Sequence, residues 1–279
     1  MAAPEPGPNL ARRRLLVVAA GGVMVGLGTL AGHGGARAGS AAQAGPASPA
    51  ARTSAIPSAS PSAARKPGGV PAGRTRVAAA RNTAPRQPMY YLDDGPKVIA
   101  LTIDDGPSPV YTPAVLRVLE KYGVLATFSM VGENVSYYPA TAKDVVEAGH
   151  AIINHTWKHA NLNSLNPAEQ LTEITRATEA IHAATGVRPR MFRAPYGAWS
   201  QHVLRCCAAE NLIPLDWSVD PRDWSRPAAR KIVRTIMKTT KTGSIILEHD
   251  GGGDRSQTVA ALQIAIPRLL DEGYRFAIP

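Results

Sequence analysis

The stretch Val98-Ile-Ala-Leu-Thr-Ile-Asp104-Asp105-Gly106-Pro107 joins a short apolar run to two adjacent carboxylates at a turn. The run Val98–Ile103 predicts a buried strand, because a short continuous apolar run that ends in a turn is typical of a strand covered on both faces. Neighbouring side chains of a regular strand point to opposite faces. We expect the Gly106-Pro107 turn to break that geometry, so that both carboxylates reach one pocket. The alternative is an Asx turn before the next helix.

Apolar runs alternate with helix-like patterns along the rest of the chain. The predicted strands are 98–103, 126–131, 151–154, 191–192, 212–215, 244–247 and 274–278. The predicted helices are 112–122, 139–148, 167–185, 201–210, 227–239 and 257–270. Strands joined by helices run parallel and gather ligand sites at their carboxyl ends. The fold class is therefore α/β; polar motifs that converge on one rim favour a barrel, and an open doubly wound sheet also fits.

His155 and His159 follow the third predicted strand and are four residues apart. This spacing faces one side of a helical turn and suits a divalent metal. Two histidines and one carboxylate form a hydrolytic zinc set that leaves a position open for water. A pair of histidines taken alone is more often a surface or core feature, so the prediction depends on a carboxylate at the neighbouring rim position.

Further polar residues follow the later strands. Arg193 can hold a nearby free carboxylate ionised and oriented, and the backbone N–H of Tyr196 can face an oxyanion. Asp223 can fix the tautomer of a catalytic histidine and raise its pKa. Trp224 offers a sugar-stacking surface, with core packing as the alternative. His249 is placed to protonate a leaving amine or alkoxide, and a satisfied buried histidine is the alternative.

Charge divides the chain at about residue 88. The whole chain of 279 residues has a formal net charge of +10. The first 88 residues hold eleven Lys and Arg and one acid, so residues 89–279 have 20 basic and 20 acidic residues and a net charge of zero. The balance gives no support to a nucleic-acid-binding face on this part. The basic tail can attract anionic wall polymers or a membrane surface, but only weakly in salt.

The N-terminal 88 residues predict export. Arg12-Arg13-Arg14 precedes an apolar stretch, and Ala36-Arg37-Ala38 offers a cleavage site, so residues 1–38 form a secretion signal. The two arginines followed by x-Leu-Leu resemble a twin-arginine signal; a plain secretory signal and an uncleaved membrane anchor are the alternatives. Residues 39–88 predict a disordered Ala/Pro/Ser/Arg linker, because they lack large apolar side chains. We expect a secreted, extracytoplasmic protein.

Only two cysteines occur, Cys206 and Cys207, and they are adjacent. A secreted domain held together by disulfides would show more cysteines. The surrounding pattern is helical, so we expect small buried residues on a helix rather than metal ligands or a redox pair.

These motifs resemble those of the polysaccharide deacetylases of carbohydrate esterase family 4. The resemblance covers about residues 96–278, with all five family motifs present in order. It implies a distorted (β/α) barrel with seven strand-helix repeats, in agreement with the strand count. Ile103 stands where the first motif often has Phe, and Lys158 stands where the histidine motif often has Ser or Thr.

The resemblance also implies a role for each residue of the site. Asp105, His155 and His159 match the metal ligands, for zinc and in some members cobalt. Asp104 matches the general base and His249 the general acid. The remaining matches are Arg193, which orients Asp104; Asp223, which tunes His249; Trp224 and Leu247, which wall the acetyl pocket; and Tyr196, the backbone oxyanion donor.

The implied activity is metal-dependent removal of N-acetyl groups from N-acetylglucosamine in peptidoglycan or chitin-type chains. The alternatives are an acetylxylan esterase and a non-catalytic glycan-binding module. The expected partner is an N-acetylated glycan, with no nucleic acid. We expect residues 89–279 to be the catalytic domain of a monomer that has no membrane span after signal cleavage and that associates with the cell wall.

Overall fold

The computed structural model describes residues 86–279. The predicted secretion signal and all but the last residues of the predicted linker lie outside this range, so both stay predictions. Within the described residues, no helix is both long and apolar enough to cross a membrane.

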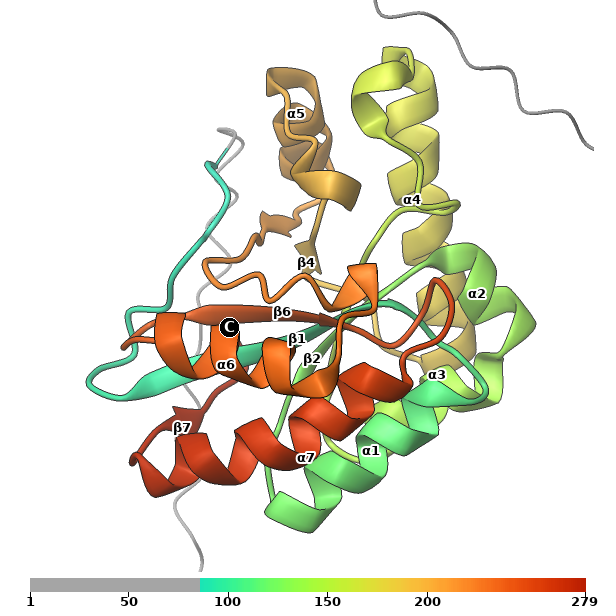
Figure 1. Ribbon diagram of the computed structural model, residues 1–279. Coiled ribbons are helices and arrows are strands. Elements are labelled where there is room, and N and C mark those ends of the chain that lie inside the picture. The colour runs from blue at the N-terminus through green and yellow to red at the C-terminus, as the bar shows by residue number, and fades with distance from the viewer. Residues whose placement is uncertain (1–85) are drawn as a thin grey trace, which may run out of the picture. The chain divides into compact units, whose positions relative to one another are not determined.

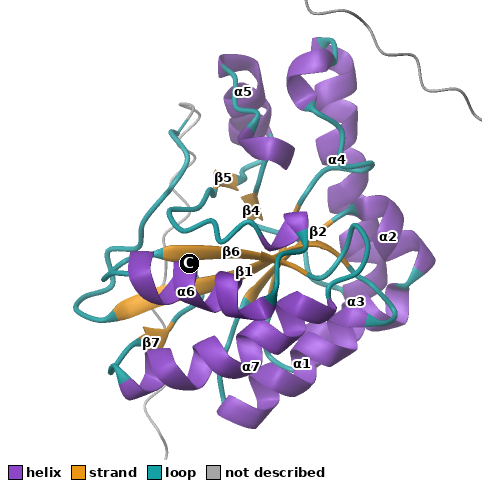
Figure 2. Cartoon of the chain, in the orientation of Figure 1, coloured by secondary structure: helices purple, strands orange, loops and turns teal. Residues whose placement is uncertain are grey.

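A curled sheet of parallel strands forms the centre of the fold (Figures 1 and 2). Its strands are β1 Val98–Gly106, β2 Thr127–Met130, β3 Ala151–Asn154, β4 Met191–Phe192, β5 Ile213–Pro214, β6 Ile245–His249 and β7 Arg275–Phe276. The order is β5-β4-β3-β2-β1-β6, and β7 pairs with the start of β1. Beyond β5, Val219 forms a parallel bridge to Ile246 of β6, so the chain curls back onto the far edge of the sheet. The predicted distorted barrel of seven strands is confirmed.

Seven α-helices accompany the strands in the described residues. They are α1 Tyr111–Tyr122, α2 Gly132–Tyr137, α3 Pro139–Glu147, α4 Pro167–Thr185, α5 Gln201–Ala209, α6 Ala229–Thr239 and α7 Ser256–Asp271. Three 3-10 turns are η1 Leu162–Ser164, η2 Pro195–Gly197 and η3 Asp223–Ser225. The predicted start of α4 is confirmed: Asn166 and Glu169 form a capping box, and Pro167 occupies the first turn.

The first strand separates two layers of core. Ile99, Leu101 and Ile103 pack in the cluster under α1, α3, α6 and α7, which lie side by side in Figure 1. Val98 and Ala100 belong to a second, inner cluster. The alternation of a strand therefore places Thr102 and Asp104 on the inner side, where polar groups can meet.

The observed elements differ from the predicted ones where backbone geometry is irregular. The short helix α2 was not predicted, since a six-residue segment that begins with Gly132 carries little periodic signal. Helix α6 begins at Ala229 rather than at Pro227, because Ala228 is extended (ψ 141°). Strands β1 and β6 extend to Gly106 and His249, so the polar motifs lie within the strand ends rather than after them.

Candidate active site

A bulge at the end of β1 carries the two adjacent aspartates. Asp104 pairs with Ser129 of β2 and Gly106 with Met130, so Asp105 is the extra residue between them. Its φ of 73° is in the left-handed region. The bulge turns the Asp105 side chain toward the same side of the sheet as Asp104. This is the departure from strand geometry that the Gly106-Pro107 turn predicted.

Three side chains converge beside this bulge. One ligand atom each from Asp105, His155 and His159 lies within 4.8 Å of the others. Nε2 of His159 is 3.1 Å and Nε2 of His155 is 3.5 Å from Oδ1 of Asp105. Burial raises the pKa of the Asp105 carboxyl, but the close approach of the His155 and His159 rings outweighs burial and holds this pKa well below its usual range. The group is a metal-binding triad.

The triad fits a divalent metal by its chemistry. Oδ1 of Asp105 is buried and has no hydrogen-bond partner. Nδ1 of His155 lies 2.8 Å from the backbone oxygen of Arg193, so this nitrogen donates and Nε2 is left with a lone pair for a metal. Imidazole nitrogens with one carboxylate oxygen are typical zinc ligands.

The two histidines lie on a loop, not on the helical turn that their spacing indicated. Thr156 and His159 have φ values of 65° and 56°, which no α-helix contains. Asn154, at the end of β3, holds this loop. Its amide nitrogen donates to the Ile174 carbonyl (2.7 Å) and to Thr178 (2.8 Å), both in α4, and its oxygen accepts from the Thr156 N–H (2.8 Å). Asn154 was not predicted as a site residue, although a polar residue that ends an apolar strand is a visible signal in the sequence.

Arg193 lies just past β4 and is completely buried. Its NH1 donates to Oδ1 of Asp104 (2.7 Å) and to the Thr102 hydroxyl (2.8 Å), and its NH2 donates to the backbone oxygen of Asp216 (3.0 Å). The other oxygen of Asp104 is 3.6 Å from Nε2 of His155. Asp104 is therefore clamped on one side and faces the triad on the other.

His249 ends β6 directly beside Asp104, its register partner on β1. Its Nδ1 is 2.7 Å from Oδ1 of Asp223, whose second oxygen accepts from the His249 N–H (2.9 Å) and from the Thr258 hydroxyl (2.7 Å). Burial alone lowers the pKa of an imidazole, but the bond to Asp223 outweighs it and raises the pKa of His249 to about 9.

Comparison with known proteins shows the family to which this chain belongs. Residues 92–212 match the family described as polysaccharide deacetylase. A chitooligosaccharide deacetylase of Bradyrhizobium sp. (strain ANU 289) is 42% identical over 192 residues, which cover 64% of this chain and 88% of that relative. This chain belongs to the polysaccharide deacetylase family. Its α/β architecture and its Asp-His-His triad agree with that membership.

Solved structures of the family agree in fold. A peptidoglycan N-acetylglucosamine deacetylase, crystallised with 4-naphthalen-1-yl-N-oxidanyl-benzamide, has a TM-score of 0.66 and 34% identity, with 67% of this chain and 88% of that chain covered. A family 4 pseudoenzyme from Bacillus anthracis has nearly the same TM-score, 0.65, at 30% identity, with 69% of this chain and 67% of that chain covered. Likeness of fold therefore does not by itself separate an active deacetylase from an inactive one.

The rim of this deacetylase surrounds a pocket of about 390 Å³. Its lining residues are Asp104, Asp105, His155, His159, Tyr196, Trp217, Asp220, Trp224, Leu247 and His249. The Tyr196 ring stands edge-on to His159 at 4.8 Å, and the Tyr196 backbone has a φ of 60°. Trp224 is 44% exposed, whereas Leu247 is buried. The structure thus brings the predicted site residues to one pocket; Arg193 and Asp223 stand behind it.

Two buried carboxyl groups, Glu248 of β6 and Asp250 of the loop after it, were not predicted as part of the site. Asp250 accepts a hydrogen bond from Thr112, and its backbone N–H donates to the Asp104 carbonyl (3.0 Å). Burial raises the pKa of Asp250 to about 7, against the opposing bond from Thr112. Gly106 packs directly on the Asp250 carboxyl, where a Cβ atom has no room. Burial, and after it the nearby Asp223, raises the pKa of Glu248 well above its usual range.

Proposed function

We propose that the protein is a zinc-dependent hydrolase that removes N-acetyl groups from N-acetylglucosamine residues of peptidoglycan or chitin-type chains. One observation carries the proposal: Asp104 and His249 are register partners on adjacent strands and both line the pocket of the metal-binding triad. A carboxylate and an imidazolium that both face a metal site are the base and the acid that amide hydrolysis needs.

Asp105, His155 and His159 hold the metal in this proposal. Zinc suits two imidazoles and one carboxylate and leaves a position open, and cobalt is the alternative metal. When bound, the ion supplies a Lewis acid that polarises the amide carbonyl and lowers the pKa of water.

Asp104 acts as the general base. Its ion pair with Arg193 keeps one oxygen bonded and oriented, while the other oxygen faces the triad. Asp104 takes a proton from water as the water oxygen bonds to the acetyl carbonyl carbon. Arg193 acts through Asp104 and does not line the pocket.

His249 acts as the general acid. With its pKa raised to about 9, it carries a proton at neutral pH, and Asp223 holds it in place through Nδ1. Nε2 of His249 donates that proton to the amide nitrogen as the carbon–nitrogen bond breaks. Acetate and a free sugar amine leave, so one water is consumed and the protons balance.

The remaining rim residues receive the acetyl group. Trp224 and Leu247 form apolar walls for its methyl group, as both line the pocket. The Tyr196 N–H, which makes no hydrogen bond within the described residues, donates to the developing oxyanion. The left-handed backbone at Tyr196 supports this role, since such conformations in non-glycine residues cluster at functional sites.

The choice of glycan rests on the relatives. They are named chitooligosaccharide deacetylase and peptidoglycan N-acetylglucosamine deacetylase, and this chain covers most of their length. Export belongs to the same proposal. Residues 1–38 act as a secretion signal, 39–88 as a linker, and 89–279 as a monomeric catalytic domain outside the cytoplasm, associated with the wall.

The test measures acetate release by the purified full-length protein, with zinc restored or with chelator. The substrates are chitin oligomers, peptidoglycan and acetylated xylan. We expect zinc-dependent release from one of the first two. We expect Asp104→Asn to lower the rate by about 100-fold or more, since a general base contributes about 10²–10⁴-fold. Asp94→Asn, at an exposed position before β1, is the matched control and keeps full activity.

Other results would redirect the proposal. Release from xylan alone identifies an esterase. Full activity of Asp104→Asn removes this residue from the role of base. No release from any substrate by a folded, zinc-loaded protein favours a glycan-binding role.

A further inference from the structure

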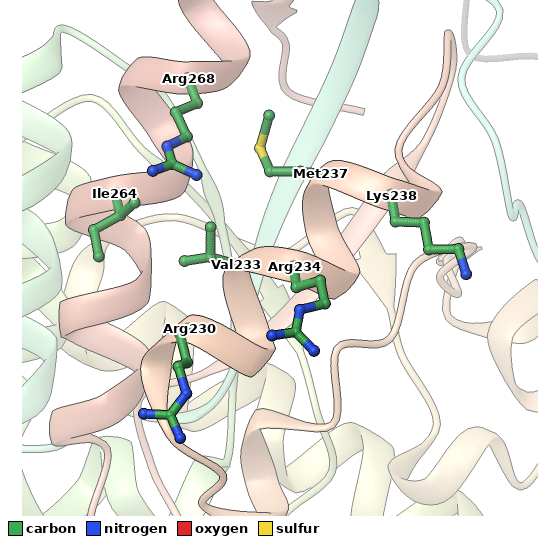
Figure 3. Close-up of a pocket in the computed structure, with 7 residues that line it drawn as sticks. All are labelled: Arg230, Val233, Arg234, Met237, Lys238, Ile264 and Arg268. Carbon is green, nitrogen blue, oxygen red and sulfur yellow. The ribbon is translucent and has the colours of Figure 1, made fainter.

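A groove lined by cationic side chains runs between α6 and α7 (Figure 3). Its volume is about 520 Å³. The lining residues are Arg230, Val233, Arg234, Met237, Lys238, Ile264 and Arg268. None of them lines the catalytic pocket, so the groove is a separate site.

No acidic residue lines this groove, and the acids nearest to Arg268 in the sequence are Asp271 and Glu272 at the end of α7. Helix α6 contains no acidic residue, and α7 contains only Asp271, its last residue. Within residues 86–279, none of the four lining cations makes a salt bridge or a side-chain hydrogen bond. The unbalanced cluster contrasts with residues 89–279 as a whole, where 20 basic and 20 acidic residues cancel.

The cations form a regular row. Arg230, Arg234 and Lys238 are four residues apart on α6, so they share one helix face with a rise of about 6 Å from each to the next. Arg268, on α7, adds a fourth cation to the lining of the groove (Figure 3). All four are exposed. A ligand with regularly repeated negative charge matches this row, because each charge meets a cation in turn.

The shape and the floor of the groove narrow the choice of polyanion. A concave channel between two helices suits a strand better than the flat surface of a bilayer. The floor consists of Val233, Met237 and Ile264, the last 39% exposed. It offers no aromatic ring, and binding of single-stranded nucleic acid depends on bases stacked on aromatic rings. Three of the four cations are arginines, whose planar guanidinium binds phosphate oxygens in pairs.

We propose that the α6–α7 groove binds a linear phosphodiester polymer with a small, base-free repeat, such as a chain of polyol phosphates. The polymer lies along α6 with its phosphates on the cationic row and its carbon units on the apolar floor. This proposal is independent of the proposed hydrolysis.

The test uses the full-length protein and purified poly(glycerol phosphate), with affinity measured by calorimetry over a range of salt concentrations. The basic N-terminal residues stay in every variant, so differences report the groove. We expect Arg234→Gln/Lys238→Gln to weaken binding by about tenfold and to reduce the slope of log K against log salt by about 1.4, given about 0.7 per phosphate on a flexible strand. Arg230→Gln/Arg268→Gln, with one change on each helix, has the same effect.

The matched control is Arg117→Gln/Lys121→Gln on α1, which removes two exposed cations at the same four-residue spacing. It binds like the wild type if the groove is the site. Circular dichroism and the thermal midpoint check that every variant is folded. Equal losses in all three pairs, or no loss in either groove pair, overturn the proposal. A second result also overturns it. The protein would bind phosphatidylglycerol vesicles or an oligonucleotide more tightly than the polymer, and the groove substitutions would abolish that binding while binding of the polymer stayed intact.

Discussion

The side chain of Arg193 contributes both to the stability of the fold and to the orientation of Asp104. It is fully buried, and it neutralises Asp104, which is itself almost fully buried. We predict that Arg193→Met lowers the free energy of unfolding by about 3–5 kcal/mol, the usual cost of leaving one partner of a buried ion pair uncompensated. Urea unfolding of the metal-free protein measures the loss. Arg190→Met, at an exposed position three residues earlier, changes it by less than about 0.5 kcal/mol. Similar values for the two variants would contradict this role of the ion pair.

His249 gives a second prediction at the residue scale. Its bond to Asp223 raises its pKa to about 9 against the effect of burial. In Asp223→Asn burial dominates, so we expect the pKa of His249 to fall far below 9. An NMR titration of the metal-free protein measures it. His150, whose pKa burial lowers, titrates in the same spectrum and is unchanged by the substitution. A pKa near 9 in both proteins would contradict the assigned cause.

The same shift predicts how stability depends on pH. The pKa of His249 is higher in the folded state than the ordinary value of about 6.5 in the unfolded state. Its contribution to stability is therefore fully present below about pH 6.5 and is lost as the pH rises through about 9. Unfolding of the metal-free wild type at pH 6 and pH 9.5, compared with Asp223→Asn at both values, isolates the contribution. We expect the difference between the two proteins to shrink at the higher pH.

At the scale of elements, Asn154 ties the histidine loop to α4. Its side chain makes two hydrogen bonds into that helix and one to the Thr156 N–H. We predict that Asn154→Ala weakens zinc binding by about 10–100-fold with all three ligands intact, as is usual when a group that orients ligands is lost. Calorimetry of the apoprotein measures this. Asn163→Ala, in the exposed turn η1, is the control. An unchanged zinc affinity of Asn154→Ala would show that the histidine loop keeps its conformation without the Asn154 hydrogen bonds.

The elements that sequence predicted well are those with a strong local pattern. The apolar run of β1 and the capping box of α4 specify their segments without help from the rest of the chain. The histidine pair was assigned to the right site but to the wrong backbone, because Thr156 and His159 adopt positive φ values that long-range contacts impose. Asp250 was missed for a related reason. Its partners Thr112 and Gly106 lie far from it in the sequence, and only the closed sheet brings them together.

At the scale of the whole molecule, residues that precede β1 already pack against the sheet. Met89 accepts from the Asp216 N–H (2.8 Å) and donates to the Pro214 carbonyl (3.0 Å), and the Leu92 N–H donates to Gly243 (2.8 Å). Leu92 also belongs to the inner core cluster. Through these contacts, the segment before β1 connects the β5 edge of the sheet to the start of β6. The packing contacts of the described residues therefore begin at Met89, next to the composition change near residue 88.

Truncation tests the role of these contacts. We predict that a chain starting at residue 86 keeps the thermal midpoint and acetate release of the full-length protein. A chain that starts at residue 96 loses the contacts of Met89 and Leu92. Full burial of one such side chain is worth about 1.5–3 kcal/mol, and about 1 kcal/mol corresponds to about 2–4 °C in a domain of this size, so we expect a midpoint lower by about 5 °C or more. Leu92→Ala in the full-length chain gives part of the same loss. Equal midpoints for both truncations would place the start of the cooperative unit at β1 itself.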